Sequence, residues 1–494
     1  MSNEEKKTFL EAIIELVEEN SNLVVDQNET PHIEIVNQGQ QQVISMFGQD
    51  FQDWLRKSFY DAFGRPLRSY DIKDAIEHLS SMAKFSGRKV VTALRLAYSD
   101  NNCYIDLGNE KREVMKITKD GYVIDKAPTV YFIQSKMAAA LPIAQEGGDL
   151  TLLRDKYLNL GSEESWILVT VYLVAAFFDL PSKPFILLNG EQGSSKSTTT
   201  RLIRELIDPS KVKAQTTPSS KSDLLLSALN NALVCIDNAS KLSPKLMDIA
   251  CQLCTGAGFS KRRLYTDTDL VSFEITRLLI INGIDADIIT APDLLSRCIQ
   301  LILPAIDKSK RVAETLFWKD FESDKPKILG ALYDLVSKVL AIHESIELKE
   351  STRLTDFCRI GVAVETVLGW EAGAFMAAMN NMQSEALAVA LDYDSTASAI
   401  MKIMKKQSKW KGTAEQLLSK MNLICDLDVT RDAKWPRSAR ALGIRLVKIT
   451  PALREQGVVI EKTKSGDRMI SITAADNASS KVKSPSHKFE KFVA

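Results

Sequence analysis

The stretch Phe185-Ile-Leu-Leu-Asn-Gly-Glu-Gln-Gly-Ser-Ser-Lys-Ser-Thr-Thr-Thr200 decides the fold of this chain. It begins with an apolar run typical of a buried strand, continues through a loop with two glycines, and ends in a helix-forming segment. This order predicts a phosphate-binding loop, because backbone N–H groups and a helix N-terminus can point at one anion. The alternative is an ordinary strand-turn-helix that matches by chance, and the required order of the three signals favours the phosphate loop.

Each residue type in this loop has a physical role in the predicted site. Gly190 and Gly193 allow the backbone to turn, and Lys196 supplies a positive charge near the β- and γ-phosphates. Ser197 supplies a hydroxyl ligand for Mg²⁺. Ser195 stands where the common pattern has its second glycine, so a side chain restricts the backbone there. The predicted ATP-binding residues are Gly190, Glu191, Gln192, Gly193, Ser194, Ser195, Lys196, Ser197 and Thr198.

A second apolar run, Ala232-Leu-Val-Cys-Ile-Asp237, ends in a carboxylate. It is typical of a buried parallel strand whose last residue reaches the crevice where ligands bind. We therefore expect Asp237 to hold Mg²⁺ together with Ser197, directly or through water. The next residue is Asn238, at a position where many P-loop ATPases have a second acid. The amide of Asn238 can position water by hydrogen bonding, but it accepts a proton poorly. Taken alone, the segment would also fit a strand that ends in a solvated aspartate.

A third apolar run, Arg277-Leu-Leu-Ile-Ile-Asn-Gly283, ends in the amide of Asn282. Further on, Arg297 closes the sequence Leu-Leu-Ser-Arg. The order of phosphate loop, Asp-ending strand, basic glycine-containing segment, Asn-ending strand and Leu-Leu-Ser-Arg resembles the superfamily III helicases. Within them it is most similar to the primase-helicase ATPases of phages, poxviruses and integrated mobile elements. The resemblance covers roughly residues 150–310.

The resemblance implies an α/β fold with a P-loop ATPase core of the AAA+ type, and a hexameric ring with ATP at subunit interfaces. It implies that Asn282 polarises the attacking water or senses the γ-phosphate. It also implies that Arg297 is a finger inserted into the neighbour's site, which suits its planar, permanently charged group. A surface or salt-bridged arginine is the alternative for Arg297. The predicted catalytic residues are Lys196, Asp237, Asn238, Asn282 and Arg297.

The basic segment 255–267 resembles the hairpin that projects into the central channel of those helicases. Its cations lie close to the aromatic residues Phe259 and Tyr265. Cations can follow a phosphate backbone while aromatic rings accept bases without reading their sequence. A solvated turn is the alternative, and the position within the ATPase favours contact with single-stranded DNA. The predicted DNA-binding residues here are Lys261, Arg262 and Arg263.

The C-terminal part predicts a winged helix. A helix is expected to begin at Thr413, a longer helical stretch follows over 438–456, and a β-hairpin over 458–472. Pro451 is expected to kink or split the longer helix. In winged helices this helix enters the major groove and the wing contacts the backbone, with protein docking as the alternative. The predicted duplex contacts are Arg440, Arg445, Lys462 and Lys464.

Composition limits the function classes. The 494 residues predict two to four domains, and the equal counts of 63 basic and 63 acidic residues mean that DNA binding depends on local patches. Seven scattered cysteines indicate reduced thiols in a cytosolic compartment. The longest apolar run, 166–178, is shorter than the ~20 residues that span a bilayer, and we find no secretory signal. We therefore expect a cytoplasmic protein without a membrane partner.

We expect an accessory α+β domain at 1–150, the ATPase core at 151–310, a helical lid or connector at 311–405, a winged-helix-like domain at 406–474 and a disordered tail at 475–494. The leading functional hypothesis is an ATP- and Mg²⁺-dependent DNA helicase or translocase that forms a homo-oligomeric ring and replicates a phage or mobile element. Whether a separate primase is a partner stays open. The alternatives are a nucleotide-switched regulatory or defence NTPase without unwinding, and a DNA-binding adaptor with a degenerate ATPase.

Overall fold

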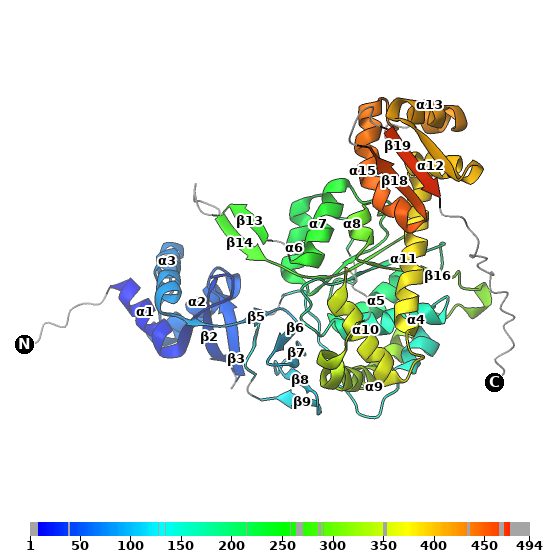
Figure 1. Ribbon diagram of the computed structural model, residues 1–494. Coiled ribbons are helices and arrows are strands. Elements are labelled where there is room, and N and C mark those ends of the chain that lie inside the picture. The colour runs from blue at the N-terminus through cyan, green and yellow to red at the C-terminus, as the bar shows by residue number, and fades with distance from the viewer. Residues whose placement is uncertain are drawn as a thin grey trace, which may run out of the picture. The chain divides into compact units, whose positions relative to one another are not determined.

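The computed structural model describes residues 8–37, 40–126, 128–133, 135–213, 215–256, 258–262, 270–284, 288–289, 291–348, 353–431, 435–463 and 469–474. The chain forms two compact units, Met1–Gln383 and Ser384–Ala494 (Figure 1). The fold is mixed α/β, with a β-rich N-terminal region and a helix-rich C-terminal region. This agrees with the predicted α/β class.

The N-terminal region combines helices with a four-stranded sheet. Its helices are α1 (Phe9–Asn20), α2 (Gln49–Phe63) and α3 (Ser69–Ser86). The sheet has the order β3-β2-β1-β4, with β1 (Ser21–Val25), β2 (Pro31–Asn37), β3 (Gln40–Ser45) and β4 (Arg88–Lys89). Helix α1 begins at a capping box in which the Thr8 hydroxyl accepts from the Glu11 N–H and the Glu11 carboxylate accepts from the Thr8 N–H. Buried residues at helical spacing, such as Phe51 and Leu55 of α2, form the core of this region.

A second antiparallel sheet follows in the chain. It is a meander of β6 (Leu96–Ser99), β7 (Asn102–Asp106), β8 (Val114–Thr118) and β9 (Gly121–Asp125). Two short strands, β5 (Thr92–Ala93) and β10 (Tyr131–Phe132), pair in parallel beside it. Buried side chains of the meander, such as Ile105 and Ile117, belong to the main hydrophobic core.

The central sheet of the first unit is parallel and has the order β12-β15-β11-β16. Its strands are β11 (Phe185–Gly190), β12 (Leu233–Ile236), β15 (Leu278–Gly283) and β16 (Cys298–Leu303). The strands are buried on both faces, which explains why they read as continuous apolar runs without alternation. The three strands predicted at 185–190, 232–237 and 277–283 are all present.

Helices cover both faces of this sheet (Figure 1). Helices α4 (Glu163–Ala175) and α5 (Lys196–Ile207) share a core with the strand residues Ile186 and Leu188, while α6 (Lys221–Asn230) and α7 (Pro244–Thr255) lie on the other side. In α4 every side chain from Trp166 to Ala175 is buried. The apolar run 166–178, which is too short to span a bilayer, is therefore part of the core.

Between α7 and β15 the chain forms an antiparallel hairpin of β13 (Gly258–Arg262) and β14 (Leu270–Glu274). This confirms the predicted hairpin at the basic segment. The tip of the hairpin, with Arg263, lies outside the described residues.

The remainder of the first unit is helical. The short helix α8 (Pro292–Leu295) precedes β16, and the long helices α9 (Glu314–Ile342) and α10 (Thr355–Leu368) follow it. The next helix, α11 (Ala374–Tyr393), contains the boundary between the two units at Gln383. A short π-helix lies at Leu153–Tyr157, and short 3₁₀-helices lie at Lys308–Lys310 and His343–Ser345. Phe321, Leu332 and Phe357, from α9 and α10, are buried in the same core as α4.

The second unit has four helices and a three-stranded sheet in the part that the structure describes. They are α12 (Ser395–Lys406), β17 (Lys409–Thr413), α13 (Ala414–Ile424), α14 (Leu427–Arg431), α15 (Ala439–Glu455), β18 (Val458–Lys462) and β19 (Met469–Ala474), with the antiparallel strand order β17-β19-β18. The predicted hairpin is confirmed by β18 and β19. The predicted disordered tail and Lys464 lie outside the described residues.

Pro451 does not split α15, contrary to one of the two outcomes expected for it. A proline inside a helix removes the hydrogen bond to the carbonyl four residues earlier, here that of Val447. Val447 is 66% exposed, so water can satisfy this carbonyl and the helix continues for a last turn.

Candidate active site

The predicted motifs meet at the carboxyl edge of the parallel sheet. The loop that follows β11, Asp237 after β12, and Asn282 in β15 all lie at this edge. Because β15 lies between β11 and β12, Asn282 is placed between the loop and Asp237. Carboxyl ends of neighbouring parallel strands are the usual ligand-binding edge of an open α/β sheet.

The loop after β11 turns through three residues with positive φ. Gly190, Gly193 and Ser195 have φ values of 155°, 82° and 65°. A Cβ at Gly190 would lie 2.5 Å from the Leu303 carbonyl oxygen, so only glycine fits there. Ser195 precedes α5 in the left-handed conformation. The position where the sequence departs from the common pattern is therefore one that favours glycine, and the side chain strains the backbone by about 1–2 kcal/mol.

Lys196 is the first residue of α5, and its ammonium group folds over the loop. Its Nζ donates to the carbonyl oxygens of Gly190 at 2.7 Å and Glu191 at 2.8 Å. Burial lowers the pKa of Lys196, and the nearby Asp237 carboxylate opposes that shift. The lysine charge is thus held within the loop by its own backbone.

Ser197 and Asp237, the two predicted metal ligands, are in direct contact. The Ser197 hydroxyl donates to the Asp237 carboxylate, with 2.8 Å between Oγ and Oδ1. The first lies at the start of α5 and the second after β12, so only the fold brings them together. A hydroxyl and a carboxylate are hard oxygen ligands of the kind that Mg²⁺ prefers.

Asn282 connects two parts of the site through its side-chain amide. It is 1% exposed, its Nδ2 donates to the Thr200 hydroxyl at 2.7 Å, and its Oδ1 accepts from the Asn238 N–H at 2.9 Å. Asn238 has a φ of 54° and an exposed side chain. Asn282 therefore fixes helix α5 relative to the turn that carries Asp237 and Asn238, and its role toward water or phosphate stays a prediction.

Arg297 lies at the other edge of the sheet. Its carbonyl accepts from the N–H of Phe185, the first residue of β11, at 3.1 Å. The loop begins at the far end of that strand, roughly 16 Å away at the usual rise per residue. The Arg297 side chain is 14% exposed, and its Nη1 donates to the Asp293 carbonyl at 2.7 Å. Arg297 therefore cannot reach the loop of its own chain.

The predicted DNA-binding residues are dispersed. Lys261 and Arg262 lie in β13, while Arg263 and Lys464 lie outside the described residues. In the second unit Arg440 is exposed near the start of α15. Arg445 forms an ion pair with Asp394, and Lys462 Nζ donates to the Gly443 carbonyl at 3.3 Å. The DNA contacts of all seven residues stay predictions.

Two residues at the loop were missed by the sequence reasoning. The guanidinium of Arg311 lies against the loop, since a Cβ at Gly193 would be 2.9 Å from its Nη2. Asn159 donates from Nδ2 to the carbonyl oxygens of Ser194 at 3.2 Å and Pro304 at 2.7 Å. Both come from segments without a recognisable motif. The basic run Lys308-Ser-Lys-Arg is the one sequence signal that could have indicated Arg311.

Two family models match the chain. The first, described as "Actinomycete integrative conjugative element replication protein", matches residues 151–385 and so contains the whole candidate site. The second, "AICE RepA C-terminal domain", matches residues 396–486. Over these two ranges the chain is similar to the RepA replication proteins of actinomycete integrative conjugative elements. The RepA family consists of mobile-element replication proteins, which confirms the expected link to mobile-element replication.

Other comparisons add little. No curated protein matches the chain significantly. The solved structure "The A form apo structure of NrS-1 C terminal region-CTR" is similar at 12% identity and a TM-score of 0.42, covering 95% of this chain and 100% of that one. "The apo structure of NrS-1 C terminal region (305-718)" gives 11% identity and a TM-score of 0.41 with the same coverage. Likenesses at these TM-scores support no conclusion. Among the described residues, no helix has the length and apolar character needed to cross a membrane.

Proposed function

We propose that this chain, which is similar to the RepA replication proteins, binds ATP with Mg²⁺ at the carboxyl edge of the sheet and couples ATP hydrolysis to movement on DNA, as a superfamily III helicase or translocase does. The observation that carries the proposal is the 2.8 Å contact between Ser197 and Asp237. It joins the two predicted metal ligands beside Lys196, although they come from different motifs.

The residues present fit a bound nucleotide and metal. The three positive-φ residues of the loop and the N-terminus of α5 form a turn of the kind that cradles phosphate. Ser197 and Asp237 would hold Mg²⁺, with the remaining ligands coming from phosphate and water. Bound ATP with its metal would supply the phosphoryl group and a concentrated positive charge.

The protein's own contribution is positioning and charge. Lys196, now bonded to loop carbonyls at 2.7 and 2.8 Å, is close enough to turn its ammonium group toward a phosphate in the loop. Arg311 adds a second cation against Gly193. Asn282 keeps Asp237 and α5 in a fixed relation through its two side-chain hydrogen bonds. These groups would stabilise negative charge that develops on the phosphate oxygens.

The arrangement supports a ring with shared sites. Arg297 lies at the amino edge, too far from the loop of its own chain. An arginine finger supplied to the adjacent subunit needs this placement, because a head-to-tail ring brings different surfaces of two copies together.

The test measures the ATPase rate with and without single-stranded DNA for the wild type and for Lys196→Ala. Lys245→Ala is the matched control, since Lys245 is an exposed lysine on α7. Hydrolysis that DNA stimulates, that Lys196→Ala abolishes and that Lys245→Ala preserves would support the motor, and a strand-unwinding assay would follow. Absence of hydrolysis in the wild type would overturn the proposal.

One observation favours a second candidate function, the nucleotide-switched regulatory or defence NTPase without unwinding activity. Asn238 occupies the place where a second acid is common, and its exposed amide is a poor proton acceptor. Such a site can bind ATP and hydrolyse it slowly. ATP-dependent oligomerisation with hydrolysis that is indifferent to DNA would support the switch and exclude the motor.

A further inference from the structure

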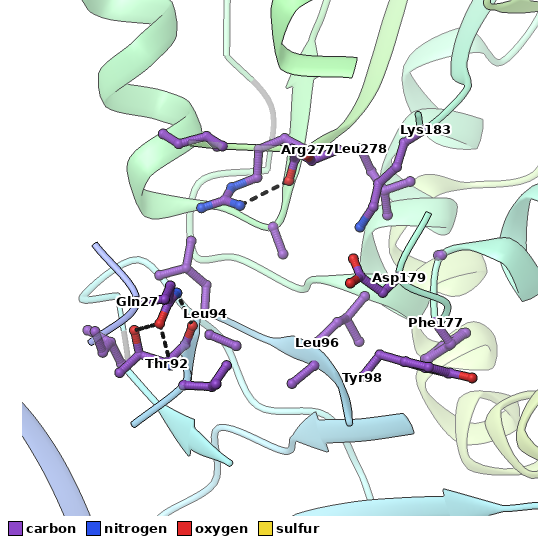
Figure 2. Close-up of a pocket in the computed structure, with 18 of the residues that line it drawn as sticks. Gln27, Thr92, Leu94, Leu96, Tyr98, Phe177, Asp179, Lys183, Arg277 and Leu278 are labelled. Atoms are coloured by element: carbon purple, nitrogen blue, oxygen red, sulfur yellow. Dashed lines mark hydrogen bonds between the residues drawn. The ribbon is translucent and has the colours of Figure 1, made fainter. Parts of the chain in front are cut away.

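A second cavity lies at the amino edge of the parallel sheet, away from the candidate active site. Its volume is about 600 Å³, within the range of small-ligand sites. Figure 2 shows its lining, which combines residues that precede strands of the central sheet with residues of the N-terminal region. The lining includes Lys183, Arg277, Asp179, Leu96 and Tyr98.

Two cations of this cavity lack an acidic partner. Among the described residues, no carboxylate lies within ion-pair distance of Lys183 or Arg277. Arg277 donates from Nε to the Ala228 carbonyl at 2.7 Å and from Nη1 to the Thr276 carbonyl at 3.0 Å, so neutral oxygens are its partners. Burial, together with a smaller contribution from the Arg277 charge, lowers the pKa of Lys183 to about 8, and burial lowers the pKa of Arg277 to about 10.

The acids nearby do not neutralise this pair. Asp179 lines the same cavity and raises the pKa of Lys183, but it lies beyond ion-pair distance. Asp26 is bonded to His32 at 3.0 Å. Asp208 is bonded to Arg95 and to the N–H groups that start β12. Partly buried cations without a counter-charge are costly, so an anion that enters the cavity would be stabilised.

The cavity lies at the base of the β13–β14 hairpin. Ile275, Thr276 and Arg277 directly follow β14, and all three line the cavity. The other end of the hairpin is close by, since a Cβ at Gly256 would lie 2.7 Å from the Thr276 hydroxyl. A single nucleic-acid strand bound along the β13–β14 hairpin would therefore reach Lys183 and Arg277 at the base of the hairpin.

We propose that the cavity lined by Lys183 and Arg277 is a phosphate site that takes the backbone of a single-stranded nucleic acid at the base of the hairpin. That the phosphate belongs to a polynucleotide rests on the proposed function. That the cavity takes a phosphate at all rests only on its two cations. The half-buried ring of Tyr98 and the side chain of Leu96 give the cavity an apolar part that suits a sugar or a base.

The test uses the full chain with Lys183→Gln and Arg277→Gln, singly and together, and Lys183→Arg as the conservative variant. Binding of a fluorescent oligothymidylate is measured over a series of salt concentrations. In the Gln variants we expect about tenfold weaker binding near 0.1 M salt. The slope of the logarithm of the binding constant against the logarithm of the salt concentration should be smaller by about 0.7 for one lost phosphate contact. Lys245→Gln, on α7, should leave both quantities unchanged, and Lys183→Arg should retain most of the affinity.

Nucleotide binding separates the possible outcomes. Each variant is also titrated with inorganic phosphate and with a non-hydrolysable ATP analogue. Binding of the analogue reports folding and the carboxyl-edge site. Weaker DNA binding with unchanged analogue binding supports the phosphate site and its polynucleotide source. Intact DNA binding with the loss of a second, weaker analogue or inorganic phosphate site assigns the phosphate to a free ligand. If all three ligands bind as in the wild type, the site is overturned, even where the ATPase proposal stands.

Discussion

The two edges of the central parallel sheet carry different chemistry. At the carboxyl edge Lys196, Ser197 and Asp237 combine a cation with oxygen ligands, and their contacts are short and specific. At the amino edge three basic residues precede strands: Lys183 lies shortly before β11, Arg277 directly before β15 and Arg297 directly before β16. The proposed sites therefore place a nucleotide with its metal at one edge and a phosphate of another ligand at the other.

The two edges show how one parallel sheet can hold two separate sets of functional side chains. Residues after parallel strands converge on one edge and residues before them on the other, because all strands point the same way. The sheet itself, buried on both faces, separates the two sets of residues by the length of a strand.

The largest effect is expected at the carboxyl edge. Asp237→Asn keeps the shape and the contact with Ser197 but removes the charge that would hold Mg²⁺. We expect the ATPase rate to fall by roughly 10²–10³-fold, comparable to the loss of one key electrostatic group. Rates measured over a range of Mg²⁺ concentrations check this. Asp248→Asn, at an exposed position of α7, is the control, and equal rates in the two variants would contradict the assignment.

Arg297 tests whether the amino edge completes the site of a neighbour. Arg297→Ala and Lys196→Ala should each be inactive. Mixed in equal amounts, they should recover activity at about one quarter of the sites of a head-to-tail ring, where an intact loop meets an intact arginine. The ATPase rate of the mixture is the measurement. No recovery in a mixture shown to form joint oligomers would rule out the shared site.

The junction of the amino edge with the N-terminal region depends on Arg95. Its guanidinium is 1% exposed and bonds to Asp208 at 3.2 Å and to the Asp106 carbonyl at 2.7 Å. Arg95→Met leaves the Asp208 charge buried, and we expect a loss of about 3–5 kcal/mol. Thermal unfolding of this variant should show a clearly lower Tm. Arg56→Met breaks an exposed ion pair with Asp53 and should change stability by less than about 1 kcal/mol.

The smallest effect concerns the strained residue of the loop. Ser195→Gly relieves the positive φ of 65° and should stabilise the protein by about 1 kcal/mol. Chemical denaturation measures the difference. Ser195→Ala keeps the strain and removes the hydroxyl, which donates to the Ser194 carbonyl at 2.5 Å. A gain in Ser195→Ala as large as in Ser195→Gly would show that the hydroxyl, and not the backbone, is responsible.

The carboxyl edge could be predicted well because its residues lie within contiguous motifs. The apolar runs specified β11, β12 and β15, and their polar ends specified Asp237 and Asn282. The contact between Ser197 and Asp237 follows from two motifs and the rule that parallel strands end together. The sequence did not indicate that Asn282 is bonded on both sides, to Thr200 and to the N–H of Asn238.

The sequence alone determined the positions of the strands, the glycine-bearing loop, the hairpins and the ligands at their ends, because these depend on local periodicity and on neighbouring residues. Only the tertiary structure decided that Arg311 lies against Gly193, that Arg297 faces away from its own loop, and that Lys183 and Arg277 share one cavity. These relations join segments that are distant in the chain. They are set by how helices and strands pack around the core, and no local pattern of side chains records that packing.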